Sequence, residues 1–316
     1  MFFGTPVWPL EWSYPYDKTI KRIADLGFKG VELIGWDAEA LNNYYTAETC
    51  ASLKKLIADL GLILTNFNYT PRGLTSEREA EREESLGCFK RAVDVAYALG
   101  AQNVTSVAPY PFPWNDGFPD GTPQIMALRH VPEVQVWTIN ADLNKDWKGA
   151  YDSYAGYVKK CCAYAGQAGF RLLIEPHPYR VVNSASSMLR LIEHVKADNL
   201  GMNFDPSHLF PQGDMPQVTI YQLADRIGHT HFSDNDTLTN VHWRPGKGKI
   251  DWYAVMKALK DVGYDGVLSL ELEDVPGAVT PDAATATGLS NSMEIELRLT
   301  MEFLTKICDS LGITLT

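Results

Sequence analysis

Short runs of apolar and β-branched residues alternate with longer amphipathic stretches from one end of the chain to the other. The short runs have the length and composition of buried strands, and we predict strands over Phe3–Val7, Gly30–Ile34, Ile63–Phe67, Asn103–Val107, Arg171–Glu175, Gly201–Asp205, Ile227–Phe232 and Gly266–Glu271. The longer stretches repeat apolar residues at helical spacing, and we predict helices over Tyr16–Leu26, Ala47–Leu60, Glu79–Leu99, Tyr151–Gly166, Ala185–Lys196, Gln217–Asp225, Asp251–Val262 and Ser292–Leu311. Strands that alternate with helices in this way predict an α/β protein, with a parallel sheet closed into a single (β/α)8 TIM barrel.

Glycine residues separate several predicted helices from the strands that follow them. It follows a predicted helix and precedes a predicted strand at Gly27, Gly61, Gly100, Gly169 and Gly263. Glycine is favoured just after a helix because it adopts the left-handed backbone conformation without steric cost. An open doubly wound sheet is the alternative fold, but the chain contains neither GxGxxG nor GxxxxGK[ST], the phosphate-binding loops common in that architecture.

One segment interrupts the pattern, the long loop after the fourth strand over residues 108–148. It is rich in aromatic and apolar side chains such as Trp114, which argues against disorder. Connections this long are usually functional, and this one leaves a strand at the end where barrel active sites lie. We therefore expect a lid or substrate-specificity loop, with a subunit contact as the alternative, inside a single domain of residues 1–316.

Composition and charge indicate which kinds of binding partner and cellular location to expect. The chain has 28 basic and 39 acidic residues and a formal charge of -11, which disfavours nucleic acid and anionic membranes. The 5 cysteines have no zinc-site spacing, which indicates free thiols in a reducing compartment. The first residues resemble neither a signal peptide nor a membrane span. We expect a cytoplasmic location.

Four predicted strands end in a side chain that can bind a metal ion: Glu175, Asp205, His231 and Glu271. Because the carboxyl ends of all strands meet at one face of a barrel, we expect these side chains to converge. Three carboxylates and one imidazole suit one divalent cation; Mn²⁺ is favoured, with Mg²⁺, Co²⁺ and Zn²⁺ as alternatives. A structural salt bridge for Glu175 and a helix N-cap for Asp205 stay open as other interpretations.

Two of these candidates have a neighbour of the same kind. His229 lies two residues before His231, and Glu273 lies two residues after Glu271, so each pair faces one side of its strand. We prefer His231 and Glu271 as ligands because they lie at the strand ends. His229 and Glu273 are then expected to pack or form hydrogen bonds around the ligands, or to lie at the rim.

The two glutamates suggest a reaction. Glu175 and Glu271 lie on strands well separated around the barrel, so they could flank a bound substrate from opposite sides. A metal that holds a carbonyl and its neighbouring hydroxyl would stabilise an enediolate, while one carboxylate removes the α proton and the other returns it. This is proton transfer at a carbon next to a carbonyl, and return of the proton to the same carbon is epimerisation. His177 and His208 are candidate donors to substrate oxygens, with a structural role as the alternative.

Three sequence stretches carry a family resemblance: Gly27–Glu32, Asn203–His208 and Pro245–Trp252. With them, essentially the whole chain resembles the sugar isomerase/epimerase superfamily of xylose-isomerase-like TIM barrels. The resemblance to its ketose 3-epimerases implies a metal bound by Glu175, Asp205, His231 and Glu271. It also implies that the two glutamates form the acid/base pair and that His208 contacts substrate.

The chain departs from those epimerases at two positions. Thr237 stands where they have an arginine, and Val181 stands where they have a second glutamate; Arg244 or Arg180 could supply the lost contacts. The chain looks closer to superfamily members that act on oxo-sugars, namely 3-oxo-glucoside epimerases and the large subunit of C-glycoside deglycosidases. A lyase that cleaves 3-oxo-C-glycosides by deprotonation and aglycone elimination is therefore the alternative function. Trp114 in the aromatic loop is the candidate contact for an aglycone.

Two other classes compete. An abasic-site endonuclease of this fold would need histidines at the third and fourth strand ends, and Thr65–Tyr69 and Ser106–Pro109 contain none. A non-catalytic sugar-binding barrel would be expected to lose a metal ligand or one of the paired glutamates, and all are present. We expect a small-molecule sugar as the partner, a homo-oligomer, and as an open alternative a small partner subunit.

Overall fold

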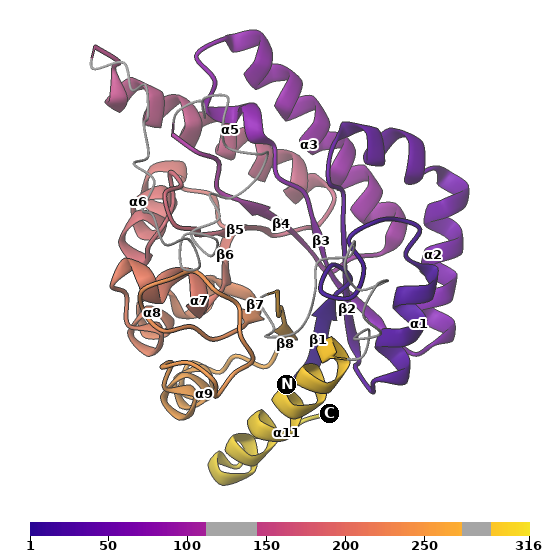
Figure 1. Ribbon diagram of the computed structural model, residues 1–316. Helices are drawn as coiled ribbons and strands as arrows, with labels where there is room; N and C mark the ends of the chain where they lie inside the picture. The colour runs from indigo at the N-terminus through magenta and orange to yellow at the C-terminus, as the bar shows by residue number, and fades with distance from the viewer. Residues whose placement is uncertain (112–143, 274–291) are drawn as a thin grey trace, which may run out of the picture.

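The fold is known from a computed structural model, which describes residues 1–111, 144–273 and 292–316. Its strands are β1 (Phe2–Pro6), β2 (Gly30–Ile34), β3 (Ile63–Asn68), β4 (Asn103–Val107), β5 (Leu172–Glu175), β6 (Leu200–Phe204), β7 (Ile227–Phe232) and β8 (Val267–Leu270). Each strand runs parallel to the next, and β8 pairs with β1, so the sheet closes into a barrel (Figure 1). The predicted (β/α)8 barrel is confirmed.

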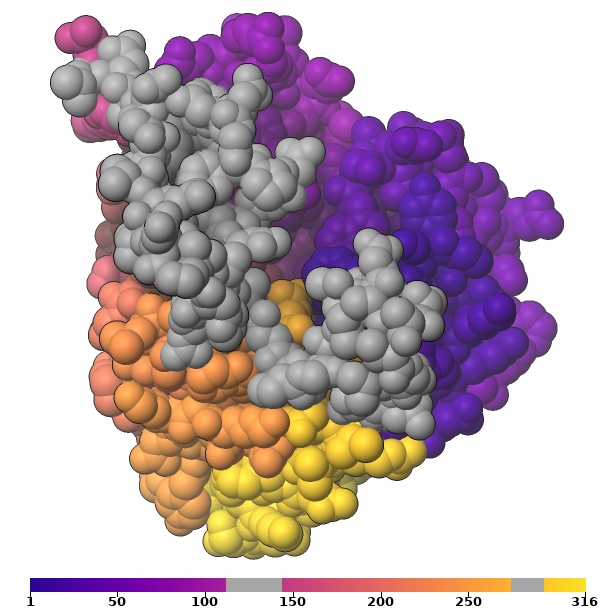
Figure 2. All heavy atoms as spheres, viewed as in Figure 1, coloured from indigo at the N-terminus to yellow at the C-terminus, as the bar shows by residue number. Residues whose placement is uncertain are grey.

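Helices surround the barrel. They are α1 (Asp17–Asp25), α2 (Ala47–Asp59), α3 (Glu79–Leu99), α5 (Trp147–Gln167), α6 (Ala185–Val195), α7 (Pro206–Leu209), α8 (Pro216–Leu223), α9 (Trp252–Asp261) and α11 (Ser292–Leu311), with short turns η1 (Ala40–Tyr44), η2 (Arg72–Thr75), η3 (Phe210–Gln212) and η4 (Ala224–Arg226). Helix α11, in yellow, lies beside α9, in orange, at one edge of the face that Figure 2 shows. In the described part of the chain, no helix is both long and apolar enough to cross a bilayer.

The local signals in the sequence explain most element boundaries. The glycine after α3, Gly100, has a φ of +80° and closes the helix by donating to the carbonyl of Ala96 at 3.0 Å. Helix α5 begins at Trp147 rather than at the predicted Tyr151, because the Asp146 carboxylate caps it by accepting from the Gly149 amide at 2.9 Å. Most of the predicted lid, including Trp114, falls in residues 112–143 and lies outside the described residues.

The interior of the barrel is polar. Fully buried side chains from β2, β3, β6 and β7 include Glu32, Asn66, Asn203 and His229. They contact one another across strands: Asn66 Nδ2 donates to Glu32 Oε2 at 3.0 Å, and His229 Nδ1 lies 3.1 Å from Asn203 Oδ1. Barrels usually fill this space with branched apolar residues, so a buried polar network here indicates support for a site above it.

Candidate metal centre and active site

The four candidate metal ligands come together at the carboxyl ends of four successive strands. Glu175 ends β5, Asp205 follows β6, His231 lies near the end of β7 and Glu271 follows β8. One ligand atom from each lies within 4.8 Å of the others, and all four side chains are buried. His231 Nδ1 is 2.7 Å from Glu175 Oε1 and 2.9 Å from Glu271 Oε2. The geometry therefore fits one divalent cation shared by three carboxylates and one imidazole.

Asp205 caps a helix with one carboxylate oxygen and directs the other toward the neighbouring histidines. Its Oδ1 accepts from the Ser207 amide at 2.7 Å and caps α7. Its Oδ2 is buried and accepts no hydrogen bond from any residue that the structure describes, although His208 Nε2 and His242 Nε2 lie 3.4 and 3.7 Å away. A buried carboxylate oxygen without a donor is costly, and a cation at this point would remove that cost.

The charges of the cluster also favour a cation. Among the described residues, no Lys or Arg side chain forms an ion pair with Glu175, Asp205 or Glu271. Burial alone would lower the pKa of His231, but Glu271, Glu32 and Glu175 outweigh it and raise that pKa well above its ordinary value. This excess of negative charge in a buried space is what a divalent ion would neutralise.

Three further imidazoles line one side of the cluster. The rings of His177 and His208 lie 3.4 Å apart, and the His242 ring meets His208 edge-on at 4.8 Å. Burial holds the pKa of both His177 and His208 well below the ordinary value, so these two rings are neutral. Within the described part of the chain, the two ring nitrogens of His177 are buried without a hydrogen-bond partner, and His177 Nε2 lies 3.5 Å from Glu175 Oε2. Neutral imidazoles in this position can donate to or accept from sugar hydroxyls.

The sequence analysis gave no role to Trp8 or His242. Trp8 follows β1, and its Nε1 donates to Glu271 Oε1 at 2.7 Å, which fixes that carboxylate. Only its place after a strand could have drawn attention to Trp8. His242 lies in the loop after β7, where an antiparallel bridge joins Asp234 to Trp243 and holds the loop beside the site. No local pattern predicts that bridge.

Glu32 is a third residue that lacked a role, although it was part of a stretch that carried the resemblance. It lies inside the barrel beneath the cluster, 3.0 Å from His231 Nε2. His229 and His231 donors counter the effect of burial and lower the pKa of Glu32 to about 2, so it is ionised. A single glutamate inside an otherwise apolar strand was the available signal.

The two arginines proposed as substrate contacts interact with groups other than the four candidate ligands. Arg244 Nε is 3.1 Å from Glu296 Oε2 of α11, so this guanidinium faces a helix and is not part of the carboxylate cluster. The Arg180 guanidinium lies 3.5 Å above the Tyr110 ring, and its burial lowers its pKa to about 10. Neither arginine forms an ion pair with the four candidate ligands, although Arg180 lies near enough to His177 to help lower the pKa of that ring. Trp114 falls outside the described residues.

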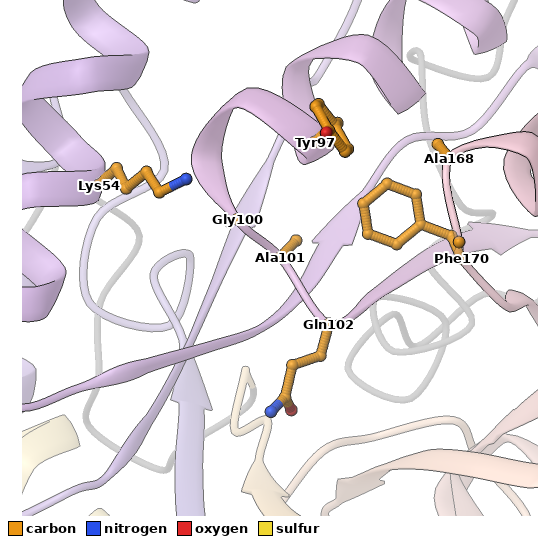
Figure 3. Close-up of a pocket in the computed structure, with 8 residues that line it drawn as sticks. Lys54, Tyr97, Gly100, Ala101, Gln102, Ala168 and Phe170 are labelled. Atoms are coloured by element: carbon orange, nitrogen blue, oxygen red, sulfur yellow. The ribbon is translucent and has the colours of Figure 1, made fainter.

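A surface hollow lies at the opposite end of the barrel, where α3 leads into β4 and α5 leads into β5 (Figure 3). Its lining includes Lys54, Tyr97, Gln102 and Phe170 and contains no carboxylate, histidine or cysteine. Loops at this end of a barrel usually serve stability. The chemistry-bearing residues are therefore concentrated at the strand ends and not in this hollow.

Comparison with known proteins identifies the family of this chain. The family described as "Xylose isomerase-like TIM barrel" matches residues 20–294. The chain belongs to this family. A D-psicose 3-epimerase from Agrobacterium fabrum is 24% identical to this xylose isomerase-like barrel over 295 residues, covering 91% of this chain and 90% of the relative. The predicted superfamily resemblance is thereby confirmed.

Two solved structures of xylose isomerase-like barrels show the same fold. A D-psicose 3-epimerase with D-tagatose from Clostridium cellulolyticum H10 matches with a TM-score of 0.73 and 20% identity, over 97% of this chain and 99% of that chain. A 3-keto-D-glucoside 4-epimerase from E. coli matches with a TM-score of 0.66 and 19% identity, over 94% and 99%. The relatives of this barrel thus include sugar epimerases.

Proposed function

We propose that this xylose isomerase-like barrel is a divalent-metal-dependent sugar epimerase or isomerase. It would move a proton at the carbon next to the carbonyl of an oxo-sugar or ketose, through an enediolate. The observation that carries the proposal is the convergence of Glu175, Asp205, His231 and Glu271 within 4.8 Å, with an orphaned carboxylate oxygen among them. Full-length similarity to a sugar epimerase supports it.

The donor set fits a cation of intermediate hardness. Three carboxylates with one imidazole nitrogen favour Mn²⁺, and Mg²⁺, Co²⁺ and Zn²⁺ are the alternatives. When bound, the cation would polarise the sugar carbonyl and the neighbouring hydroxyl and so make the α proton more acidic.

Glu175 and Glu271 are the proposed acid/base pair. Each has one oxygen beside His231 Nδ1, and the second oxygen of each is directed elsewhere. Trp8 holds Glu271 Oε1, and His177 lies beside Glu175 Oε2. One glutamate removes the proton from carbon, and the other delivers a proton to the opposite face, which inverts that carbon. Trp8 keeps the Glu271 carboxylate oriented across the cycle.

The substrate class follows from the side chains beside the cluster. His177 and His208 present neutral nitrogens, which suit the hydroxyls of an uncharged sugar. Thr237 and Val181 occupy the positions where the arginine and glutamate of ketose 3-epimerases were expected, and this difference favours an oxo-sugar over a free ketose. Because the relatives reported above are epimerases, we rank epimerisation ahead of elimination from a 3-oxo-C-glycoside.

Proton NMR in D₂O tests the proposal. The Mn²⁺-loaded protein and the same protein after removal of metal by a chelator would be incubated with D-fructose, D-psicose and 3-oxo-glucose. Metal-dependent loss of one C–H signal together with a new epimer supports the proposal and identifies the carbon. Release of an aglycone from an aromatic 3-oxo-C-glucoside would instead favour the lyase. No exchange by metal-loaded protein with any of these sugars contradicts proton transfer on sugars of these classes.

A further inference from the structure

Glu32 is buried far from solvent in the middle of the barrel, and the proposed reaction gives it no contact with the sugar. Its side chain is 0% exposed, and it lies between strands β3, β7 and β8. An ionised carboxylate at such a depth is strongly destabilising unless donors surround it. The identity and arrangement of these donors therefore indicate the function of this buried carboxylate.

The donors divide between the two oxygens of Glu32. Oε2 accepts from Asn66 Nδ2 at 3.0 Å and Asn68 Nδ2 at 3.1 Å, and it lies 3.0 Å from His231 Nε2. Oε1 accepts from the Ser269 hydroxyl. Asn66 is oriented in turn, because its Oδ1 accepts from Thr105 at 3.0 Å, which leaves its Nδ2 for Glu32. Side chains from three strands thus hold the carboxylate in one place.

This arrangement turns one nitrogen of His231 toward the interior and the other toward the cluster. The other partners of Glu32 are amide and hydroxyl donors, so this carboxylate accepts, and His231 Nε2 is the donor in the 3.0 Å contact with Glu32. Nδ1 lies 2.7 Å from Glu175, 2.9 Å from Glu271 and 3.1 Å from the Asn203 amide nitrogen, and a cation that took this position would bind Nδ1 of a ring whose N–H is on Nε2. The ring therefore offers a ligand atom to the centre of the cluster and its N–H to the interior.

We propose that Glu32 is a positioning residue that sets the affinity of the cluster for its divalent cation by fixing the orientation and tautomer of His231. The inference rests on the proposed role of His231 as a cation ligand. The negative charge of Glu32 also makes Nδ1 a stronger electron donor through the ring. Ser269, the register partner of His231 on β8, and Asn68 hold Glu32 without touching the ring.

Cation titration by calorimetry tests this role. Metal-free wild type, Glu32→Gln and Glu32→Leu would be titrated with Mn²⁺ at one pH. We expect Glu32→Gln to bind Mn²⁺ about 10–100-fold more weakly, and Glu32→Leu, which has no acceptor, at least as weakly. Glu193→Gln makes the same chemical change at an exposed position and is the matched control, which should bind Mn²⁺ like the wild type. Asn68→Ala and Ser269→Ala each remove one donor that holds Glu32, and their affinity should lie between those of the wild type and Glu32→Gln. Wild-type affinity in folded Glu32→Gln would overturn the inference.

A second measurement needs no variant of Glu32. In wild type labelled with ¹⁵N-histidine and loaded with diamagnetic Zn²⁺, NMR reports the protonation of each ring nitrogen, and His231→Asn identifies the His231 signals. We expect a protonated Nε2 and an unprotonated, cation-shifted Nδ1; the reverse pattern would overturn the inference. If the wild type binds no divalent cation at all, the proposed function fails. If it binds Mn²⁺ and Glu32→Gln binds it equally well, only the role of Glu32 fails.

Discussion

The loop after β7 depends on one buried carboxylate, and this dependence gives a quantitative prediction. Asp234 is 0% exposed. Its Oδ1 accepts from the amides of Asn235 and Ile250 at 2.9 and 3.1 Å. Its Oδ2 accepts from the Gly246 amide at 2.9 Å and from Trp252 Nε1 at 3.0 Å. The two oxygens therefore hold the beginning, the middle and the end of the loop that carries His242.

Asp234→Asn keeps the shape of the side chain but replaces one acceptor oxygen with a donor NH₂ group. In either orientation of the amide, two of the four donors then face another donor. A hydrogen bond to a charged group contributes about 1.5–3 kcal/mol, and partial relaxation of the loop recovers part of the loss. We therefore expect the free energy of unfolding to fall by roughly 3 kcal/mol.

Urea unfolding followed by circular dichroism measures this change. Asp251→Asn is the matched control, because Asp251 lies in the same loop, is exposed, and caps α9 by accepting from Ala254 at 3.0 Å, a role that asparagine fills nearly as well. The control should stay within about 0.5 kcal/mol of the wild type. If the Asp234→Asn protein is as stable as the control, this carboxylate does not hold the loop.

Three further predictions concern the proposed reaction. Glu175→Gln or Glu271→Gln should lower solvent exchange at the sugar carbon by at least about 10³-fold with the fold retained, whereas exposed Glu193→Gln should be unaffected; activity in either site variant would refute the acid/base assignment. Removal of the cation by a chelator should abolish turnover and lower the melting temperature, since Mn²⁺ at about 100 times its Kd stabilises a folded protein by about 2.7 kcal/mol, and an unchanged melting curve would count against the site. Trp8→Phe should lower kcat about tenfold through the lost bond to Glu271, measured by steady-state kinetics, and unchanged kcat would show that Trp8 does not orient that carboxylate.

The barrel could be predicted from the sequence because the patterns that indicate its strands and helices are local. The limits of β2, β4, β7, α3 and α11 agree with their predicted ranges, since an apolar run or a helical repeat is bounded by residues with a clear preference, such as Gly100. Helix α5 starts earlier than predicted. Its N-cap, Asp146, lies before the apolar pattern from which the later start at Tyr151 was predicted. The eight-stranded closure then followed from the alternation itself.

The candidate ligands could be predicted for a related reason. A barrel brings the carboxyl ends of its strands together, so Glu175, Asp205, His231 and Glu271 needed only their positions at strand ends to be proposed as neighbours. Their convergence in the structure agrees with that expectation, while metal binding and catalysis by them stay predictions.

The residues that support the ligands could not be assigned from the sequence. Glu32 meets His231 across the barrel at a separation of 199 residues, and Trp8 meets Glu271 at a separation of 263. His242 Nε2 lies 3.7 Å from Asp205 Oδ2, in a loop that hydrogen bonds to Asp234 help to close. Contacts of this kind depend on which side chains meet inside a closed barrel, and no spacing along the chain encodes them.

Anomalous diffraction from crystals grown with Mn²⁺ would locate the proposed cation. We expect an anomalous peak within bonding distance, about 2.0–2.3 Å, of one oxygen each from Glu175, Asp205 and Glu271 and of His231 Nδ1. No peak among these four atoms at saturating Mn²⁺, or a peak bound through His231 Nε2, would contradict this expectation.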